Sequence, residues 1–318
     1  MVMHIACAAD EPYVGHCAAM LDSLLVHNRD DEIHVHYLHA PEFSSACRAQ
    51  LRALVDGLGG RIEFLEIGDS AVSGLPTMDR IPRAMWYRIF LPELLPDLDR
   101  ILYLDADTLV VDRLAPLWET PLDGRYVGAV SNVFEPQYAD RPRRLGLPNT
   151  QEYFNSGVLL FNLDAMRAGG CTKRIVDFAR AEDLLWPDQD ALNVVLGARR
   201  ESLHPRWNCM NSLFLFPQAR EVFGVQRLRE ACRNPGIVHF EGPELAKPWH
   251  YLSKHPYRRS YEEHRSRTPW PDVVVEGRTW PNRLLRPLPT RVAIATQVRW
   301  ARLRPRLKRS LGRLRRMR

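Results

Sequence analysis

The stretch RILYLDADTLV, residues 100–110, decides the fold that we expect for this chain. After Arg100 it is a short apolar run, typical of a buried β-strand, that leads directly into Asp105 and Asp107. Side chains two positions apart on an extended chain point the same way, so the two carboxylates should converge at the strand's end. Unpaired carboxylates repel each other, and oxygen ligands of this kind favour Mg²⁺ or Mn²⁺ over Zn²⁺. Because the D-x-D pattern is short, a solvated turn or a helix cap is the alternative interpretation.

Strand and helix patterns alternate on the N-terminal side of this stretch. Apolar runs predict strands over residues 4–9, 32–40 and 61–67, and helical spacing predicts helices over residues 15–27, 44–58 and 78–95. Repeated β-α-β units predict a mostly parallel sheet with helices on both faces, and such sheets bind ligands beyond the carboxyl ends of their strands. Asp10 follows the first strand and could therefore share a crevice with Asp105. It could equally be a helix N-cap or a partner for a nucleobase or ribose.

The C-terminal side carries further strand and helix patterns. Strands are predicted over residues 126–134 and 154–163, helices over residues 171–182 and 188–197, and a short strand followed by a loop over residues 236–250. Residues 204–218 are irregular and aromatic, and residues 251–290 have the composition of an extended packing segment or linker. No internal repeat is visible.

Polar residues at the ends of these elements are weak candidates individually. Arg88 lies in the pattern of an amphipathic helix, where a lone arginine is more often a surface residue, and would be of interest only beside a phosphate or sugar. Asn155 precedes an apolar strand and could bind sugar hydroxyls, although a simple turn explains it as well. Asp188 and Gln189 stand at a helix start, where Asp188 is a plausible N-cap.

A second group of candidates follows the short strand near residue 239. His239 could be a buried structural histidine or a metal ligand. Gly242 permits close approach of the backbone, and Lys247 offers a cation suited to phosphate.

Composition limits the class of protein. The chain has 318 residues, of which 45% are apolar and 26% charged, which excludes a disordered or fibrous protein. No apolar run reaches the length of a membrane-spanning helix, and the N-terminus lacks the pattern of a secretory signal. The six cysteines show no metal-type spacing, so we expect reduced thiols in a cytosolic protein.

Charge is concentrated at the C-terminus. Residues 277–318 hold 14 Arg and Lys and no acidic residue, so the net charge of +6 leaves −8 on residues 1–276. Within residues 291–318, Leu303, Leu307, Leu311 and Leu314 form one helical stripe among arginines. A basic amphipathic helix of this kind binds anionic membranes, whereas a disordered solubilising or RNA-binding tail is the alternative.

The order of these motifs is more specific than any one of them. AAD at residues 8–10, Arg88, LYLDAD at 102–107, YFNSGVLLFNL at 153–163, PDQDALN at 187–193 and HFEG…AKPWH at 239–250 succeed one another along the chain. In this order the chain resembles the retaining glycosyltransferases of family 8, most closely the bacterial lipopolysaccharide galactosyl- and glucosyltransferases. The resemblance covers roughly residues 1–250.

The resemblance implies a GT-A fold, a UDP-hexose donor and Mn²⁺ or Mg²⁺, on the inner face of a bacterial inner membrane. By position it implies that Asp105, Asp107 and His239 are metal ligands. It assigns the uridine side to Asp10, the donor sugar to Arg88, Asn155, Asp188 and Gln189, and the diphosphate to Gly242 and Lys247. Gln189 and Asp188 are also the expected catalytic residues.

The expected domain organisation has three parts. Residues 1–250 form a GT-A catalytic domain, residues 251–290 a packing segment or linker, and residues 291–318 a basic, membrane-associating tail. The expected acceptor is a saccharide or a lipid-linked saccharide of lipopolysaccharide or a related envelope glycan, and no nucleic acid is expected.

The resemblance implies front-side attack. The sequence itself offers no clear nucleophile for double displacement, since Gln189 is a poor one and Asp188 and Asp190 are unplaced. Three departures affect the details. Pro12 stands where relatives often carry an amide that contacts the nucleotide, Asn132 stands where a relative's Asp contacts the acceptor, and four residues separate Gly242 from Lys247 where relatives have two.

Three other classes of protein remain as alternatives. They are a nucleic-acid-binding protein that uses the Arg-rich tail, a non-catalytic sugar-nucleotide-binding module, and a sugar nucleotidyltransferase. The net charge of −8 on residues 1–276 disfavours the first, the intact Asp105, Asp107 and His239 disfavour the second, and the missing Gly-rich loop after the first strand disfavours the third.

Overall fold

A computed structural model describes residues 1–77, 83–242, 246–272, 274–289 and 292. The chain divides into two compact units, the first comprising residues 1–241 and 261–272 and the second the remainder. The predicted membrane-associating tail at residues 291–318 lies outside the described residues, apart from Val292.

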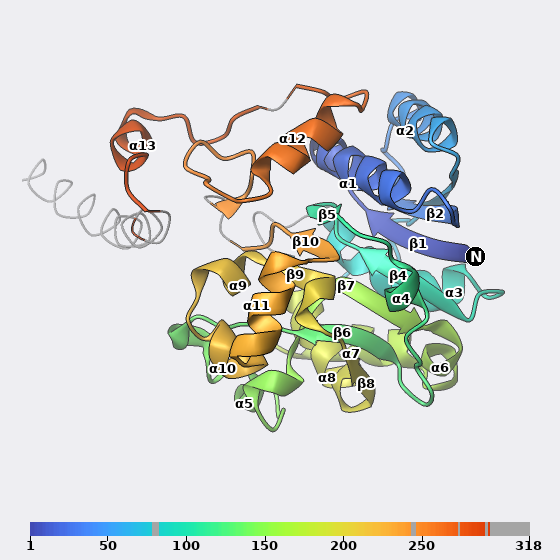
Figure 1. The fold of residues 1–318 in the computed structure, drawn as a ribbon. Coiled ribbons are helices and arrows are strands. Elements are labelled where there is room, and N and C mark those ends of the chain that lie inside the picture. The colour runs from blue at the N-terminus through green and yellow to red at the C-terminus, as the bar shows by residue number, and fades with distance from the viewer. Residues whose placement is uncertain (78–82, 243–245, 273, 290–291, 293–318) are drawn as a thin grey trace, which may run out of the picture. The chain divides into compact units, whose positions relative to one another are not determined.

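A seven-stranded sheet forms the centre of the first unit (Figure 1). Its strand order is β3-β2-β1-β4-β7-β6-β8, and all neighbouring pairs are parallel except those made by β7. The predicted mixed α/β fold with a mostly parallel sheet is confirmed. A second sheet, in the order β5-β10-β9, joins β5 and β10 as an antiparallel pair.

The N-terminal half of the first unit alternates strands with helices. In chain order its elements are β1 (Val2–Ala8), α1 (Val14–His27), β2 (Glu32–His39), α2 (Ser45–Gly57), β3 (Arg61–Glu66), α3 (Leu91–Leu94), β4 (Arg100–Leu104) and β5 (Thr108–Val110). Ser44 caps α2 by accepting a hydrogen bond from the backbone N–H of Cys47.

The second half adds short helices around the reversed strand β7. Its elements are α4 (Ala115–Trp118), β6 (Val127–Ser131), α5 (Arg141–Arg144), β7 (Phe154–Asn162), α6 (Leu163–Ala168), α7 (Cys171–Ala181), α8 (Pro187–Leu196), β8 (Arg200–Ser202), β9 (Cys209–Met210), α9 (Asn211–Leu215), α10 (Ala219–Phe223), α11 (Val225–Arg233) and β10 (Ile237–His239).

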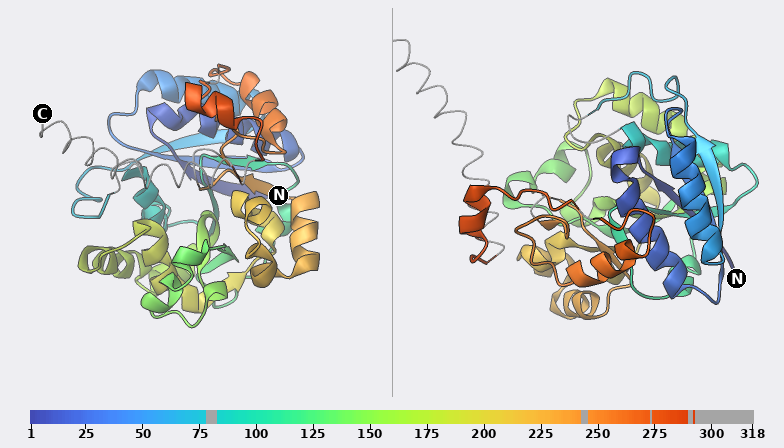
Figure 2. Two further views of the ribbon diagram at one scale, coloured as in Figure 1. Left: turned by 90° about the vertical axis from the view of Figure 1, so that its left-hand side faces the viewer. Right: turned by 90° about the horizontal axis from the view of Figure 1, so that it is seen from above.

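Each face of the large sheet carries its own hydrophobic core. Alternate residues of β1 divide between the two faces, because neighbouring side chains of a strand point in opposite directions. Ile5 and Cys7 pack with α1 and α2, while Ala6 and Ala8 pack with α7 and α8. Figures 1 and 2 show the two sets of helices on opposite sides of the sheet.

Three local predictions differ from the structure. The described part of the helix predicted over residues 78–95 is a 3-10 helix, Arg83–Phe90, followed by α3, which begins at Leu91. Pro92 lacks an N–H group and therefore fits the first turn of this new helix but not the middle of a continuous one. The strand predicted over residues 100–110 breaks at 105–107, where the N–H of Asp105 donates to Gly157 O at 2.8 Å and β5 leaves for the second sheet. Asp188 lies inside the first turn of α8 and does not cap it, since the helix begins at Pro187 with Trp186 as its N-cap.

Residues 261–272 fasten to α1 of the first unit through a buried carboxylate. Asp22 is 1% exposed, and its Oδ2 accepts hydrogen bonds from His264 Nδ1 and Arg267 Nη2, both at 2.7 Å. Burial alone would raise the pKa of Asp22, but these two hydrogen bonds outweigh burial and lower it. Helix α12 (Arg258–Ser266) supplies His264.

The second unit contains α13 (Trp280–Leu285), which Thr279 caps by accepting a hydrogen bond from the N–H of Asn282. Six of the ten exposed large apolar side chains of the described residues lie between positions 274 and 292. Among the helices of the described residues, none combines the length and the apolar character needed to span a bilayer. All six cysteines are free, and four of them are buried.

Candidate active site

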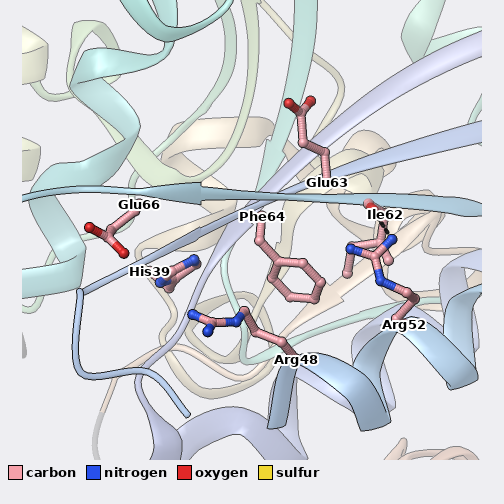
Figure 3. Close-up of a pocket in the computed structure, with 7 residues that line it drawn as sticks. All are labelled: His39, Arg48, Arg52, Ile62, Glu63, Phe64 and Glu66. Atoms are coloured by element: carbon pink, nitrogen blue, oxygen red, sulfur yellow. Dashed lines mark hydrogen bonds between the residues drawn. The ribbon is translucent and has the colours of Figure 1, made fainter. Parts of the chain in front are cut away.

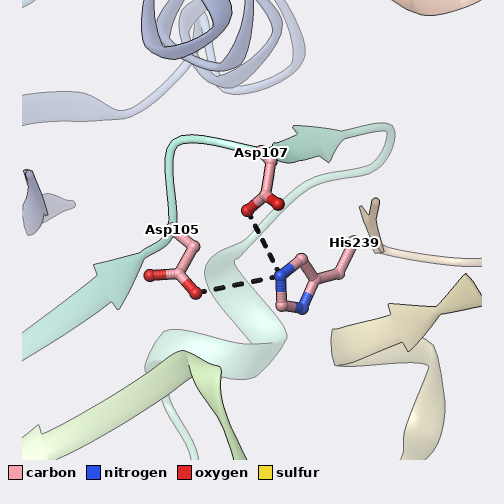
Figure 4. Close-up of side chains that lie close together, drawn as sticks. All are labelled: Asp105, Asp107 and His239. Atoms are coloured by element: carbon pink, nitrogen blue, oxygen red, sulfur yellow. Dashed lines mark ion pairs between the residues drawn. The ribbon is translucent and has the colours of Figure 1, made fainter. Parts of the chain in front are cut away.

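Two carboxylates and an imidazole converge at the end of β4 (Figure 4). His239 Nε2 lies 3.3 Å from Asp107 Oδ1 and 3.8 Å from Asp105 Oδ2. One ligand atom from each of the three side chains lies within 4.8 Å of those from the other two. Two carboxylate oxygens and an imidazole nitrogen suit Mn²⁺ or Mg²⁺, so these residues fit a divalent cation.

The turn between the two sheets places these residues. Asp105 and Asp107 occupy the break between β4 and β5, and His239 is the last residue of β10, which pairs with Thr108 of β5. The Phe240 N–H donates to Asp107 O at 2.9 Å, which holds the end of β10 against the turn. The Thr108 hydroxyl donates to Asp105 O at 2.8 Å and closes the turn.

Gly157 on β7 leaves room for this cluster. A Cβ added at Gly157 would lie 2.2 Å from His239 Cε1 and 2.8 Å from Asp105 Oδ2. The backbone of Gly157 is ordinary strand backbone, so sterics alone require a glycine there.

Electrostatics within the cluster favour a charged His239. Burial alone would lower the pKa of His239, which is 3% exposed. The hydrogen bond and charge of Asp107, with the charge of Asp105, outweigh burial, so the pKa of this imidazole is raised from its usual value.

Arg88 connects the cluster to α8 from inside the protein. Its side chain is 4% exposed, and Nη2 lies 3.0 Å from Asp105 Oδ1 and 3.6 Å from Asp188 Oδ2. Nη1 also donates to Ser156 O, and the guanidinium lies 4.2 Å from the centroid of the Tyr103 ring. Burial raises the pKa of Asp188, and the charge of Arg88 opposes that shift. Arg88 is therefore buried between two carboxylates, whereas its sequence context also allowed a surface position.

Amides from β7 and α8 lie beside this ion pair. Gln189 Oε1 accepts from Ser156 N at 3.0 Å and from Asn155 Nδ2 at 3.2 Å. The Ser156 hydroxyl lies 3.4 Å from Asp188 Oδ2. The structure thus brings Arg88, Asn155, Asp188 and Gln189 together beside the three candidate metal ligands.

Asp190, in contrast, is fully buried and fully bonded. Its Oδ1 accepts from the Tyr153 hydroxyl at 2.7 Å, and its Oδ2 accepts from Arg141 Nη2 at 2.5 Å and from the N–H groups of Leu185 and Trp186, each at 3.0 Å. Its side chain is 0% exposed. These four hydrogen bonds fix the start of α8 and leave the carboxylate no access to a substrate.

Asp10 follows β1 at the same sheet edge as Asp105. β1 and β4 are parallel neighbours, with Ala6 opposite Tyr103, so their carboxyl ends lie together. Burial raises the pKa of Asp10. Asp10 precedes the 3-10 helix Glu11–Tyr13 without capping it through its side chain.

Gly242 and Lys247 belong to the second unit. Gly242 has φ +81°, which favours glycine, and its Cβ position has no neighbour within 4 Å. Lys247 Nζ lies 5.3 Å from the centroid of the Trp249 ring.

Asn208 is a site residue that sequence reasoning missed. It is 0% exposed, its Oδ1 lies 2.9 Å from His239 Nδ1, and its Nδ2 donates to Asn155 Oδ1 at 2.8 Å. Residues 204–218 were interpreted as irregular and aromatic, and an asparagine in such a stretch carries no signal of its own.

A shallow pocket on the first unit lies elsewhere (Figure 3). It is lined by residues of β2, α2 and β3, namely His39, Arg48, Arg52, Ile62, Glu63, Phe64 and Glu66. None of the predicted site residues lines it, and β3 is the outer strand of the sheet, so we do not assign the active site there.

Comparison with protein families gives one match over most of the chain. The family described as "Glycosyl transferase family 8" matches residues 4–253. General stress protein A of Bacillus subtilis (strain 168) is 33% identical over 277 residues, which cover 85% of this chain and 95% of that protein. Lipopolysaccharide 1,2-glucosyltransferase of Escherichia coli (strain K12) is 26% identical over 274 residues, covering 85% of this chain and 79% of that enzyme.

A solved structure supports the same placement. The galactosyltransferase LgtC, crystallised with donor and acceptor sugar analogs, superposes with a TM-score of 0.73 at 29% sequence identity. The superposition covers 84% of this chain and 96% of that one.

Proposed function

Since the chain belongs to glycosyl transferase family 8 and is a glycosyltransferase with a GT-A fold, we propose that it transfers galactose or glucose from UDP to a saccharide acceptor. The observation that carries this proposal is the convergence of Asp105, Asp107 and His239 with Arg88 and Asp188 beyond the carboxyl end of β4. Cleavage of a sugar–diphosphate bond requires a cation site next to polar side chains that can bind the sugar.

The chemistry concerns the charge that develops on the leaving group. We propose that Asp105, Asp107 and His239 hold Mn²⁺ or Mg²⁺, which when bound stabilises the negative charge of the departing diphosphate. Fixed positive groups aimed at developing charge are usually the largest single contribution to catalysis in such sites. We assign Gly242 and Lys247 to the diphosphate as well, on family resemblance alone.

We assign the donor sugar to residues that include side chains of β7 and α8. Asp188 can accept hydrogen bonds from sugar hydroxyls, and the charge of Arg88 opposes the rise in the pKa of Asp188 that burial causes. Asn155 and Gln189 present amides beside it. Asp10, at the same sheet edge, is assigned to the uridine side. Removing Arg88 would leave Asp105 and Asp188 without their shared cation, so Arg88 organises both halves of the site.

We propose retention of the donor configuration by front-side attack. Double displacement needs a carboxylate that can reach the anomeric carbon. The four hydrogen bonds of Asp190 and its complete burial argue against that residue as the nucleophile. Asp188 is engaged with Arg88 and the Ser156 hydroxyl, and Gln189 is a poor nucleophile.

The acceptor is proposed to be a lipopolysaccharide or related envelope glycan, reached from the cytoplasmic face of the bacterial inner membrane. The named relative that acts on lipopolysaccharide supports this choice of acceptor class. On α13, Trp280 is 74% exposed and Leu284, four positions later, 68% exposed. Exposed apolar side chains that precede a strongly basic segment in the sequence favour docking on anionic lipid.

One experiment separates this proposal from a non-catalytic binding module. The purified full chain is incubated with Mn²⁺ and a panel of UDP-sugars, and UDP release is measured with and without a saccharide acceptor and with excess chelator. Turnover of UDP-galactose or UDP-glucose that chelator abolishes, with an α-linked product by anomeric proton coupling, supports the proposal. Binding without turnover, full activity in chelator, or a β-linked product would contradict it.

A further inference from the structure

We propose that Asn208 is a positioning residue that fixes the tautomer of His239 through a directed chain of side-chain amides. The proposal rests on the cation site proposed above. The chain runs from His239 to Asn208, Asn155 and Gln189, and every link is between 2.8 and 3.2 Å. All of these residues belong to the first unit.

Two backbone N–H groups of β7 set the direction of the chain. A backbone N–H can only donate, so the side-chain atom facing it must be an oxygen. Gly157 N–H donates to Asn155 at 3.0 Å, which makes that atom Oδ1, and Ser156 N–H donates to Gln189 at 3.0 Å, which makes that atom Oε1. The orientation of both amides is therefore fixed independently of His239.

The direction of the remaining links follows from these two. Because Asn155 presents Oδ1 to Asn208, Asn208 must donate to it through Nδ2. The Oδ1 of Asn208 therefore faces His239 Nδ1, at 2.9 Å. An amide oxygen cannot donate, so His239 Nδ1 must carry a proton. The lone pair of the neutral imidazole then resides on Nε2, the atom that faces Asp105 and Asp107.

Burial keeps water away from the hydrogen bond between Asn208 and His239. Asn208 is 0% exposed and His239 3% exposed, so water cannot replace a missing partner. A partner that orients the second nitrogen of a ligating histidine typically changes metal affinity by 10–100-fold. Without the Asn208 oxygen, the imidazole could carry its proton on Nε2, directed at the two carboxylates, where it would exclude a cation.

Two variants of similar volume separate positioning from packing. Asn208→Leu removes both hydrogen bonds, and we expect the affinity for Mn²⁺ alone, without donor, to fall about 10–100-fold. In Asn208→Asp, one carboxylate oxygen still accepts a hydrogen bond from His239 Nδ1, but the other oxygen faces Asn155 Oδ1 and cannot donate to it. We therefore expect near-normal Mn²⁺ affinity with a lowered kcat, because the link to Asn155 and Gln189 is broken. A role in packing alone would affect both variants alike.

The test measures Mn²⁺ affinity by electron paramagnetic resonance of the free ion and follows the His239 ring nitrogens in a long-range ¹H–¹⁵N spectrum. Asn28→Leu is the matched control: Asn28 is also buried (1% exposed) and bridges Leu24 O and the Leu114 N–H, far from β7 in the sequence. It should lower stability and leave Mn²⁺ affinity unchanged.

The outcomes are distinguishable. Weak binding by Asn208→Leu, with a shifted His239 nitrogen pattern and normal binding by Asn208→Asp, supports the proposal. Wild-type affinity in Asn208→Leu, or equal losses in both Asn208 variants, overturns it. If the wild-type chain itself binds no Mn²⁺ or Mg²⁺, the proposed cation site is wrong, and this result is distinct from a failure of the role proposed for Asn208.

Discussion

Replacing Gly157 with alanine should disable the cation site and leave the sheet intact. The new Cβ would lie 2.2 Å from His239 Cε1 and 2.8 Å from Asp105 Oδ2. Carbon atoms in good contact are about 3.5–4.0 Å apart, so His239 would have to move by more than about 1 Å. Both neighbours are proposed cation ligands, and β7 is paired with β4 on one side and β6 on the other, so it cannot easily move away.

The expected magnitude follows from that displacement. A shift of about 1 Å in a catalytic group can lower activity about 10²-fold, and overpacking of a core costs about 1–3 kcal/mol in free energy of unfolding. The backbone of Gly157 itself tolerates a side chain, because it does not have a positive φ. Mn²⁺ affinity and UDP release should therefore fall much more than stability does.

Gly128→Ala on the neighbouring strand β6 is the matched control. Its Cβ would meet only leucine side chains, with Leu203 Cδ2 at 3.3 Å and Leu122 Cδ2 at 3.4 Å. It should lower the free energy of unfolding, measured in urea, without changing Mn²⁺ affinity. If Gly157→Ala binds Mn²⁺ as tightly as the wild type and keeps its turnover, the steric reasoning is wrong.

Three further results are expected. Asp107→Ala should lower UDP-sugar turnover at least about 10²-fold and weaken Mn²⁺ binding, and wild-type turnover in this variant would remove Asp107 from the cation site. Burial lowers the pKa of His36 to about 4 from 6.5, so stability is lost as the pH falls from 6.5 towards 4, by at most about 3 kcal/mol. In His36→Leu, the free energy of unfolding measured in urea should depend less on pH. An unchanged pH dependence in this variant would contradict the lowered pKa of His36. Deleting residues 291–318 should weaken sedimentation with anionic vesicles and leave UDP-sugar hydrolysis largely intact, and Trp280→Ser with Leu284→Ser should weaken it further. Unaltered sedimentation of the truncated chain, or no sedimentation of the full chain at low salt, would reject the membrane interpretation.

Periodic patterns in the sequence predicted six of the seven strands of the large sheet, and only the short strand β8 (Arg200–Ser202) was not predicted. The stretch containing Asp105 was predicted as a buried strand that ends in carboxylates, and β4 does end at Leu104. The alternation of strands and helices before it predicted the parallel strands β1, β2 and β3 on one side of β4. The break between β4 and β5 was missed because it depends on a hydrogen bond from Asp105 N to Gly157 O, 52 residues away in sequence, which no local pattern encodes.

Side-chain contacts within the site were harder to predict. Asp190 had the right chemistry for a nucleophile, and only the structure reveals that Tyr153 and Arg141 occupy its oxygens. Arg88 looked like a surface residue of an amphipathic helix, and its burial depends on carboxylates from two other elements. Partners that come from separate parts of the chain leave no trace in residue spacing.

The balance of charge in the site explains why these residues belong together. When ionised, Asp105, Asp107 and Asp188 bring three negative charges, and Arg88, buried between two of them, brings one positive charge. A cation binds the neutral form of imidazole, so with His239 as a neutral ligand the group carries a net −2, which a divalent cation would cancel. A buried arginine alone therefore cannot neutralise the site, and a buried, uncompensated charge is expensive. The raised pKa of His239 has the same origin, because the surplus of carboxylates favours any positive charge placed among them. The net charge of the site and the chemistry of its ligands therefore both favour a divalent cation. Gly157, which has no side chain, leaves the space that His239 and Asp105 need to come together.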